Sequence, residues 1–149
     1  MLLETLKTLF ERDLNKLRTE IELYTNEDNI WKIDKQIANS AGNLCLHLMG
    51  NLNTYIGAEI GKTNYVRHRE QEFSLKNIPR AELIDNIEKT KAIILLSLEK
   101  LTVEELEKEY PIVVFENKTT TGYFLVHLTA HLAYHLGQIN YHRRLLDVA

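Results

Sequence analysis

At 149 residues, with 44% hydrophobic and 26% charged residues, the chain has the size and composition of one globular domain, which we expect to span residues 1–149. The formal net charge of -3 argues against a nucleic-acid partner, because no segment gathers many unopposed lysines and arginines. A single cysteine leaves no internal disulfide framework, and the N-terminal segment lacks the apolar run of a signal peptide or membrane span, so we expect a cytoplasmic protein with no membrane partner.

The first part of the chain predicts two long helices. Residues 2–24 carry an apolar stripe at steps of three and four residues, which is the period of an amphipathic helix. Its members are Leu3, Leu6, Phe10, Leu14, Leu17 and Ile21. After the turn formers of residues 25–34, a second helix is expected over about residues 36–60, with Gly61 as its stop. This second helix is apolar on more than one face, which indicates that it is buried.

A polar connector, residues 62–73, separates these helices from the next one. Pro79 suits the start of a third helix over about residues 80–100, because proline fits the first position of a helix. Residues 101–110 are expected to add a further helical turn.

The segment PIVVFENKTTT, residues 111–121, predicts an extended or loose loop with at most a short strand. Thr120 or Thr121 can then cap a final helix over about residues 122–146. Four long helices joined by at least one long crossover predict an all-α fold, a four-helix bundle.

Four of the six histidines lie in the stretch HLTAHLAYHLGQINYHRR, residues 127–144. At 100° per residue, His127, His131, His135 and His142 share an arc of about 80° on one helix face. The rise of about 1.5 Å per residue puts His142 roughly 10 Å from His135 along the axis, which is too far for both to bind one ion. Residues four apart can converge on a metal, so either His127 with His131 or His131 with His135 can form a two-histidine clamp.

Two ligands rarely hold a metal, and catalytic zinc usually takes three protein ligands. His47 lies in the middle of the second apolar helix and is the natural third ligand. His68 lies between Arg67 and Arg69, and we expect it to be solvated, because a cationic neighbourhood disfavours a metal ion.

Two amides share the face of His47: Asn43 lies one turn before it and Asn51 one turn after it. Polar groups on a buried helix need internal partners. Three roles stay open for these amides, namely support of a metal ligand, contact with a substrate, or a hydrogen-bonded network in the core.

Other metal signatures do not fit the final helix. A zincin requires HExxH, but leucines follow both His127 and His131. The ExxH pattern of di-iron bundles is also missing, because Phe124 lies three residues before His127. Cys45 lies about 200° around its helix from His47, so we expect it to pack in the core.

The final helix ends in His142, Arg143 and Arg144. We expect these residues to close the helix end, where positive charge complements the helix dipole. The alternative is that one of the two arginines, with Arg67 or Arg69, binds an anionic substrate group.

Three segments carry a resemblance to a known family: NSAGNLCLHLMGNL (residues 39–52), YVRHREQEF (residues 65–73) and HLTAHLAYHLGQINYHRRLL (residues 127–146). Together with the order of the helices, they resemble the DinB-like superfamily, also called YfiT-like, and most closely a branch with no established activity. The resemblance implies a four-helix bundle with one metal ligand from the second helix and two from the last.

In that family the helical ligand pair is the HxxxH just before a Gly-Gln step. The step is here Gly137-Gln138, so the resemblance implies His47, His131 and His135 as the metal ligands. The candidates for contacts to the ligands or to a substrate are Asn43, Asn51, His127, Gln138, Arg67 and Arg69.

The resemblance also implies what the protein does. Members of the superfamily hold zinc or nickel, several are transferases or isomerases that use a low-molecular-weight thiol, and homodimers are common. We therefore expect a divalent-metal enzyme that transfers such a thiol to a small-molecule substrate, with metal-assisted hydrolysis as the second reaction. No Glu or Asp in the three segments stands out as a general base, which favours thiol activation.

Two alternatives to an enzyme stay open. One is a non-enzymatic, metal-stabilised dimer or small-molecule binding protein, and the other is a metal-free bundle whose histidines are structural.

Overall fold

The computed structural model describes residues 1–148, and within them the chain is all-helical, as predicted. The helices are α1 (Leu2–Leu23), the 3-10 helix η1 (Glu27–Trp31), α2 (Ala41–Leu52), the π-helix η2 (Asn53–Ala58), α3 (Arg69–Ser74), α4 (Arg80–Glu99), α5 (Val103–Leu106) and α6 (Thr121–Leu146). The β-type pairings in this range are two isolated bridges, between Asp34 and Ile37 and between Glu109 and Thr120. No helix of the described range is long and apolar enough to span a membrane.

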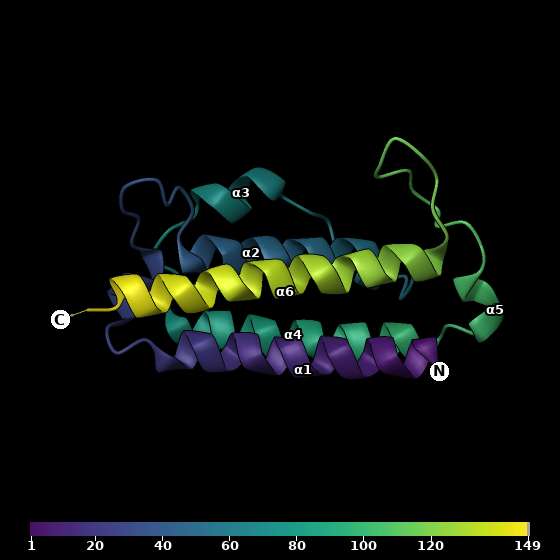
Figure 1. Cartoon of the computed structure of the whole chain (residues 1–149), viewed down its shortest axis with the longest axis horizontal. Helices are drawn as coiled ribbons and strands as arrows, with labels where there is room; N and C mark the ends of the chain where they lie inside the picture. Colours follow the sequence, from purple (N-terminus) through teal and green to yellow (C-terminus); the bar gives the residue numbers. More distant parts are fainter. Residues whose placement is uncertain (149) are drawn as a thin grey trace.

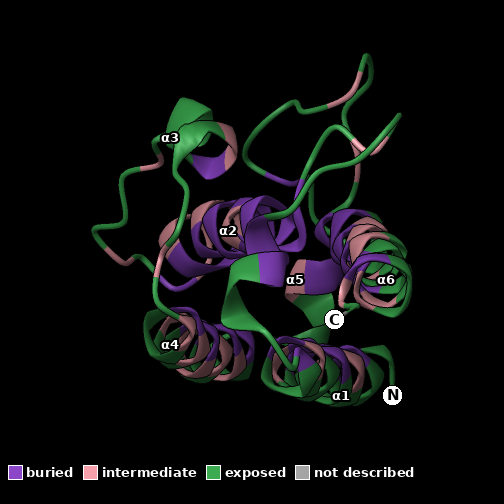
Figure 2. Cartoon of the chain, turned by 90° about the vertical axis from the view of Figure 1, so that its left-hand side faces the viewer, coloured by how far each residue is buried: buried purple, intermediate pink, exposed green. Residues whose placement is uncertain are grey.

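The four long helices α1, α2, α4 and α6 lie side by side around a common core, with α1 and α4 in one layer and α2 and α6 in the other (Figures 1 and 2). α2 and α4 run in the same direction, since Asn53 contacts Thr90 and Gly57 lies beside Ile93. Two parallel helices need a connection that returns along their length. Residues 59–79, which contain α3, are this crossover.

The inward faces of the four helices form the core (Figure 2). The apolar stripe predicted for α1 is buried along its whole length, from Leu3 to Ile21. Cys45 of α2 is fully buried as predicted, and burial raises the pKa of its thiol to about 12. A thiol in this state is a packing group and not a nucleophile.

Local hydrogen bonds decide where α2 and α6 begin. The predicted start of the second helix near residue 36 is wrong, because residues 34–37 form a tight turn and the helix starts after Ser40. The Ser40 hydroxyl accepts from the backbone N–H of Asn43 at 3.2 Å, an N-cap that sequence periodicity does not locate. Thr120 caps α6 as predicted, because its hydroxyl accepts from the backbone N–H of Tyr123 at 3.1 Å.

The polar connector contains a short helix, α3, which lies on the outer side of α2 (Figure 1). Asn43 holds it there: Nδ2 donates to the carbonyl oxygens of Glu72 at 2.9 Å and of Leu75 at 2.8 Å. Of the three roles open for Asn43, the structure therefore supports the core network. Asn43 anchors the segment that carries Glu72.

His142 does not close the helix end, and that prediction is wrong. Its ring is buried, Nε2 donates to the carbonyl oxygen of Lys32 at 2.7 Å, and Nδ1 accepts from the Tyr24 hydroxyl at 2.7 Å. His142 thus ties α6 to the end of α1 and to the chain after η1.

The two arginines that follow His142 also have partners away from the last carbonyl groups. Arg143 pairs with Glu20 of α1 at 2.8 Å, and Arg144 lies over the Tyr141 ring. Both arginines nevertheless lie in the last turn of α6, so the predicted placement of positive charge at this helix end is confirmed.

A candidate metal centre

Three histidines from two helices converge in the layer formed by α2 and α6. One ring nitrogen each of His47, His131 and His135 lies within 4.8 Å of the other two. His47 comes from α2, and the other two lie one turn apart on α6. No other group of three or more His, Cys, Asp or Glu side chains in the described residues is close enough to hold an ion.

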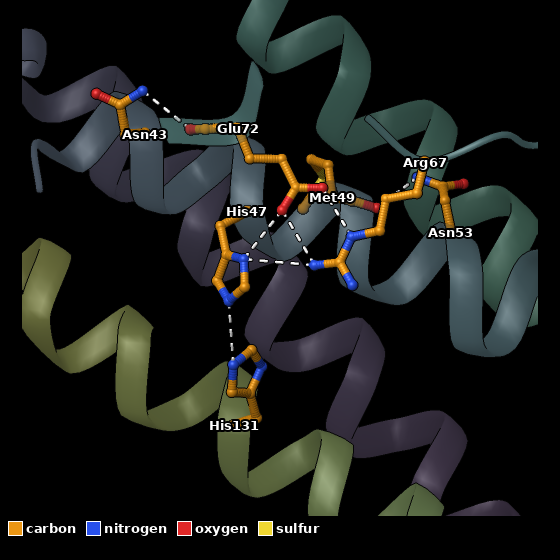
Figure 3. A network of polar contacts seen from close by, with 7 residues as sticks. All are labelled: Asn43, His47, Met49, Asn53, Arg67, Glu72 and His131. Carbon is orange, nitrogen blue, oxygen red and sulfur yellow. Dashed lines mark hydrogen bonds and ion pairs between the residues drawn. The ribbon is translucent and has the colours of Figure 1, made fainter. Parts of the chain in front are cut away.

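The ring of His47 is oriented by a carboxylate (Figure 3). Oε1 of Glu72 lies 3.0 Å from Nδ1 of His47, and because a carboxylate only accepts, Nδ1 is the donor. This fixes the tautomer and leaves the Nε2 lone pair pointing to α6. A carboxylate behind a histidine is the usual support of a metal-binding imidazole.

Arg67 fixes Glu72 in turn. Its Nε donates to Oε2 at 2.8 Å and its Nη2 to Oε1 at 3.0 Å, so the guanidinium holds both carboxylate oxygens. Burial raises the pKa of Glu72, but the hydrogen bonds from His47 and Arg67 outweigh it, and the net pKa is lowered. Glu72 is therefore ionised and fully engaged.

His135 is oriented by its own helix. Its Nδ1 donates to Oε1 of Gln138 at 2.7 Å, three residues on, which leaves Nε2 free. The Gln138 amide thus contacts a candidate ligand, as the Gly-Gln step suggested. Burial lowers the pKa of His135 against the opposing effect of this hydrogen bond.

His131 lies between the other two rings. Its Nδ1 is buried without a hydrogen-bond partner in the described residues, so the packing of the rings and the contact of its Nε2 with His47 orient it. Burial, together with His135 and His47, lowers the pKa of His131 to about 4. At neutral pH its imidazole is therefore uncharged, and one ring nitrogen offers a lone pair to a metal ion.

The separation of the nitrogens suits one ion. The Nε2 atoms of His47 and His131 are 3.3 Å apart. Two nitrogens at about 2.05 Å from a tetrahedral zinc ion are separated by roughly 3.3 Å, so this pair already has the spacing of two ligands. Three neutral imidazoles fit zinc, nickel, copper or iron, and the donor set does not choose among them.

Gly50 leaves room for this network on α2. A Cβ at this position would overlap Oε2 of Glu72. The carboxylate therefore rests directly on the backbone of the helix that carries His47, and a glycine inside this helix has a packing reason.

A cavity of about 380 Å³ opens beside His47 and His131. Arg67, Arg69 and Asn51 line it, together with His127 and several apolar side chains. His127 does not join the three clustered histidines. Its ring packs against Phe115 and Phe124, with centroids 4.7 and 5.9 Å away.

A second cavity, of about 500 Å³, borders His135 and Gln138. Its walls are the segment 36–39, Leu44 of α2 and side chains of α6 between Tyr134 and Leu145, and no acidic or basic side chain lines it apart from histidines. The histidine cluster thus has one cavity lined by arginines and one lined mostly by uncharged groups.

Over residues 1–148 the chain matches the family described as "Protein of unknown function (DUF1572)". The chain belongs to this family. No curated protein matches it. The DUF1572 match covers every residue of the histidine cluster and both cavities.

The structure of this DUF1572 protein shows two residues that sequence reasoning missed. Glu72 lies in the segment YVRHREQEF, in which the sequence alone marks no Glu or Asp as a functional carboxylate. A six-residue helix has no periodicity that would mark Glu72 as inward-facing. Gly50 carried a weak signal, because glycine inside a buried helix is costly without a packing reason.

The remaining candidate site residues lie in different surroundings. Arg67 contacts Glu72 and Arg69 lines the cavity, while His68 is exposed, as predicted. Asn51 is buried beside the cluster and its Oδ1 has no hydrogen-bond partner in the described residues.

Proposed function

We propose that this protein is a divalent-metal enzyme with the four-helix-bundle fold of the DinB-like superfamily, and that it transfers a low-molecular-weight thiol to a small electrophile. The observation that carries the proposal is the cluster of His47, His131 and His135. In this cluster Nδ1 of His47 and Nδ1 of His135 are engaged as donors, so that Nε2 of both rings bears the lone pair. A family whose function is not known leaves the reaction to be argued from these residues.

The roles of the side chains follow from their contacts. His47, His131 and His135 would hold the ion, Glu72 and Gln138 would keep two of these rings in place, and Arg67 would keep Glu72 ionised. A divalent ion in such a site lowers the pKa of a thiol that it binds, so that the thiol reacts as the thiolate near neutral pH.

The engagement of the carboxylate that contacts the cluster favours a thiol over water as the nucleophile. Glu72 is the carboxylate in contact with the cluster, and Arg67 and His47 occupy both of its oxygens. It is thus a poor proton acceptor. A free thiol has a pKa of about 8.5 and water about 15.7, so a thiol needs much less help to lose its proton.

The two cavities support a reaction with two substrates. The thiol would enter on the side of His47 and His131, and an uncharged electrophile would occupy the cavity at His135. The thiol proton leaves to water, the sulfur forms a bond to the electrophilic carbon, and the leaving group departs with the bonding electron pair. No oxidant or reductant is required.

The test uses untagged protein loaded with zinc or with nickel, because a histidine tag would supply ligands of its own. A panel of thiols is paired with alkyl halide and epoxide electrophiles, and thiol consumption is followed with metal-free protein as the control. Metal-dependent thioether formation supports the proposal. A metal-loaded protein that binds thiols but transfers none would instead indicate a non-enzymatic binding protein.

We also propose a cytoplasmic homodimer of a single-domain chain. The outer face of α6 supports the dimer, because no Lys, Arg, Asp or Glu occurs between Thr121 and His142 and several large side chains there are exposed. They are Tyr123, Val126, Tyr134 and Tyr141. Sedimentation of the wild-type chain and of the Tyr134→Glu variant tests this: a dimer that becomes a monomer supports the proposal, and a wild-type monomer overturns it.

A further inference from the structure

The cavity beside His47 and His131 carries an uncompensated positive charge. Arg67 is neutralised by Glu72, with which it forms an ion pair of 2.8 Å. Arg69 lines the same cavity, and within residues 1–148 it takes part in no ion pair or side-chain hydrogen bond. No Asp or Glu is among the lining residues. A site of this charge favours an anionic ligand.

Asn51 provides an independent sign of a ligand. This residue is 7% exposed, it lines the same cavity, and its Oδ1 is buried without a hydrogen-bond partner in the described residues. Buried polar atoms are nearly always paired in folded proteins. An orphaned amide oxygen at the wall of a cavity calls for a donor from a bound molecule.

The size and the remaining walls limit that molecule. A cavity of about 380 Å³ suits a small metabolite. Val114, Phe124 and Leu128 add apolar surface to its wall. The ligand therefore combines a short apolar body, a negative charge and a hydrogen-bond donor.

We propose that this cavity is the binding site for a small thiol that carries a carboxylate and an amide or hydroxyl group, with Arg69 pairing with the carboxylate and Asn51 accepting from the donor. The thiol part rests on the proposed function, since the sulfur would reach the histidine cluster from this cavity. A carboxylate fits because the planar guanidinium of arginine binds its two oxygens with two parallel hydrogen bonds. The cavity at His135 lacks such a cation, so the acidic substrate is assigned to this side.

The first experiment compares two thiols that differ in charge. N-acetylcysteine and N-acetylcysteine amide are titrated into the cobalt-loaded full chain, and the sulfur-to-cobalt absorption band reports binding. We expect the acid to bind at least tenfold more tightly than the amide. Because the two thiols also differ in intrinsic acidity, the decisive readout is the change of this ratio in Arg69→Gln, which should fall close to one with metal content unchanged.

A matched control and a second variant separate the two contacts. Arg144→Gln removes an exposed arginine that lies over Tyr141 outside this cavity, and it should keep the wild-type ratio. Asn51→Leu should weaken both thiols by the same factor, because both carry the amide N–H. A ratio that survives Arg69→Gln, or an Asn51→Leu variant that binds both thiols as the wild type does, overturns the assignment.

A thiol-free probe keeps this inference distinct from the proposed function. N-acetylalanine has the carboxylate and the amide but no sulfur, and calorimetry measures its binding to the wild type and to Arg69→Gln. Binding of N-acetylalanine that is lost in Arg69→Gln supports the carboxylate-binding site. If neither thiol gives an absorption band in the same protein, only the activation of a thiol is refuted. If instead N-acetylcysteine and its amide bind equally well, only the carboxylate-binding site is refuted.

Discussion

Oε1 of Glu72 lies 3.0 Å from Nδ1 of His47, although the two residues come from different helices and the connector that carries Glu72 looks polar throughout. The contact gives His47 a fixed tautomer and a fixed direction. It also explains why a segment outside the four long helices matters for the candidate metal site. Asn43 anchors that segment, and Arg67 holds the carboxylate in place.

Replacing Glu72 should weaken metal binding without unfolding the protein. Glu72→Gln keeps the shape but removes the charge that supports the His47 ring, so we expect the metal dissociation constant to rise roughly 10- to 100-fold. Competition with a chromophoric chelator measures it. Glu70→Gln, an exposed neighbour on α3, is the control and should keep the wild-type affinity. Equal affinity in both variants would show that Glu72 does not support the site.

Gly50→Ala tests the same contact from the opposite side. The added methyl group would overlap the Glu72 carboxylate and push it away from His47, so metal affinity should fall by about the same 10- to 100-fold. Gly137→Ala is the matched control on α6, where a Cβ meets nothing within 4 Å. That variant should keep its affinity and gain about 0.5–1 kcal/mol of stability, because alanine is the better helix former. A Gly50→Ala protein with unchanged affinity would contradict the described packing.

The roles of Glu72 and His142 show where sequence reasoning ends. Apolar periodicity predicted the helices, because a long amphipathic stripe such as Leu3 to Ile21 has one stable way to be buried. The three clustered histidines are those that the family resemblance implied, whereas spacing alone left two helical pairs open. Spacing could not locate Glu72, because its partner lies in another element.

Helix boundaries were less predictable than the helices. The second helix begins after the Ser40 cap and not near residue 36, because local side-chain hydrogen bonds and not apolar period decide the first turn. The position of His142 beside two arginines predicts a role at the helix end. Its actual partners, Tyr24 and Lys32, are more than a hundred residues away in sequence.

Removing the His142 ring should destabilise the fold and spare the metal site. His142→Ala leaves the buried Tyr24 hydroxyl and the Lys32 carbonyl oxygen without a partner, which should cost roughly 2–4 kcal/mol in the free energy of unfolding. Urea denaturation of the metal-free protein measures the change. His68→Ala, on the exposed connector, should stay within about 0.5 kcal/mol of the wild type. Loss of metal from folded His142→Ala would contradict the separation of the two roles.

Asp147 should make stability depend on pH in the acid range. Partial burial raises its pKa, but hydrogen bonds from Asn29, Thr25 and Asn26 outweigh this and lower the pKa from 3.8 to about 2. A carboxyl group with a lowered folded-state pKa binds fewer protons when folded, so its contribution is present above about pH 4 and is lost as pH falls towards 2. Arg143 carries the nearby positive charge and stays protonated throughout this range.

The variant Asp147→Asn isolates this effect. At pH 7 it should be less stable than the wild type by about 1 kcal/mol, because a neutral amide oxygen is a weaker acceptor for these donors. Thermal melts at several pH values should show the two proteins converging between pH 4 and pH 2. A difference that stays constant over this range would mean that the Asp147 charge is not responsible.

The most direct test of the metal centre is elemental analysis of untagged protein after saturation with zinc and removal of excess ion. We predict one ion per chain in the wild type and in His127→Ala, and almost none in the three variants His47→Ala, His131→Ala and His135→Ala. Circular dichroism should show that all of them keep their helices. A His135→Ala protein that retains a full equivalent of metal, or a wild type that retains none, would contradict the central claim that these three histidines hold one ion.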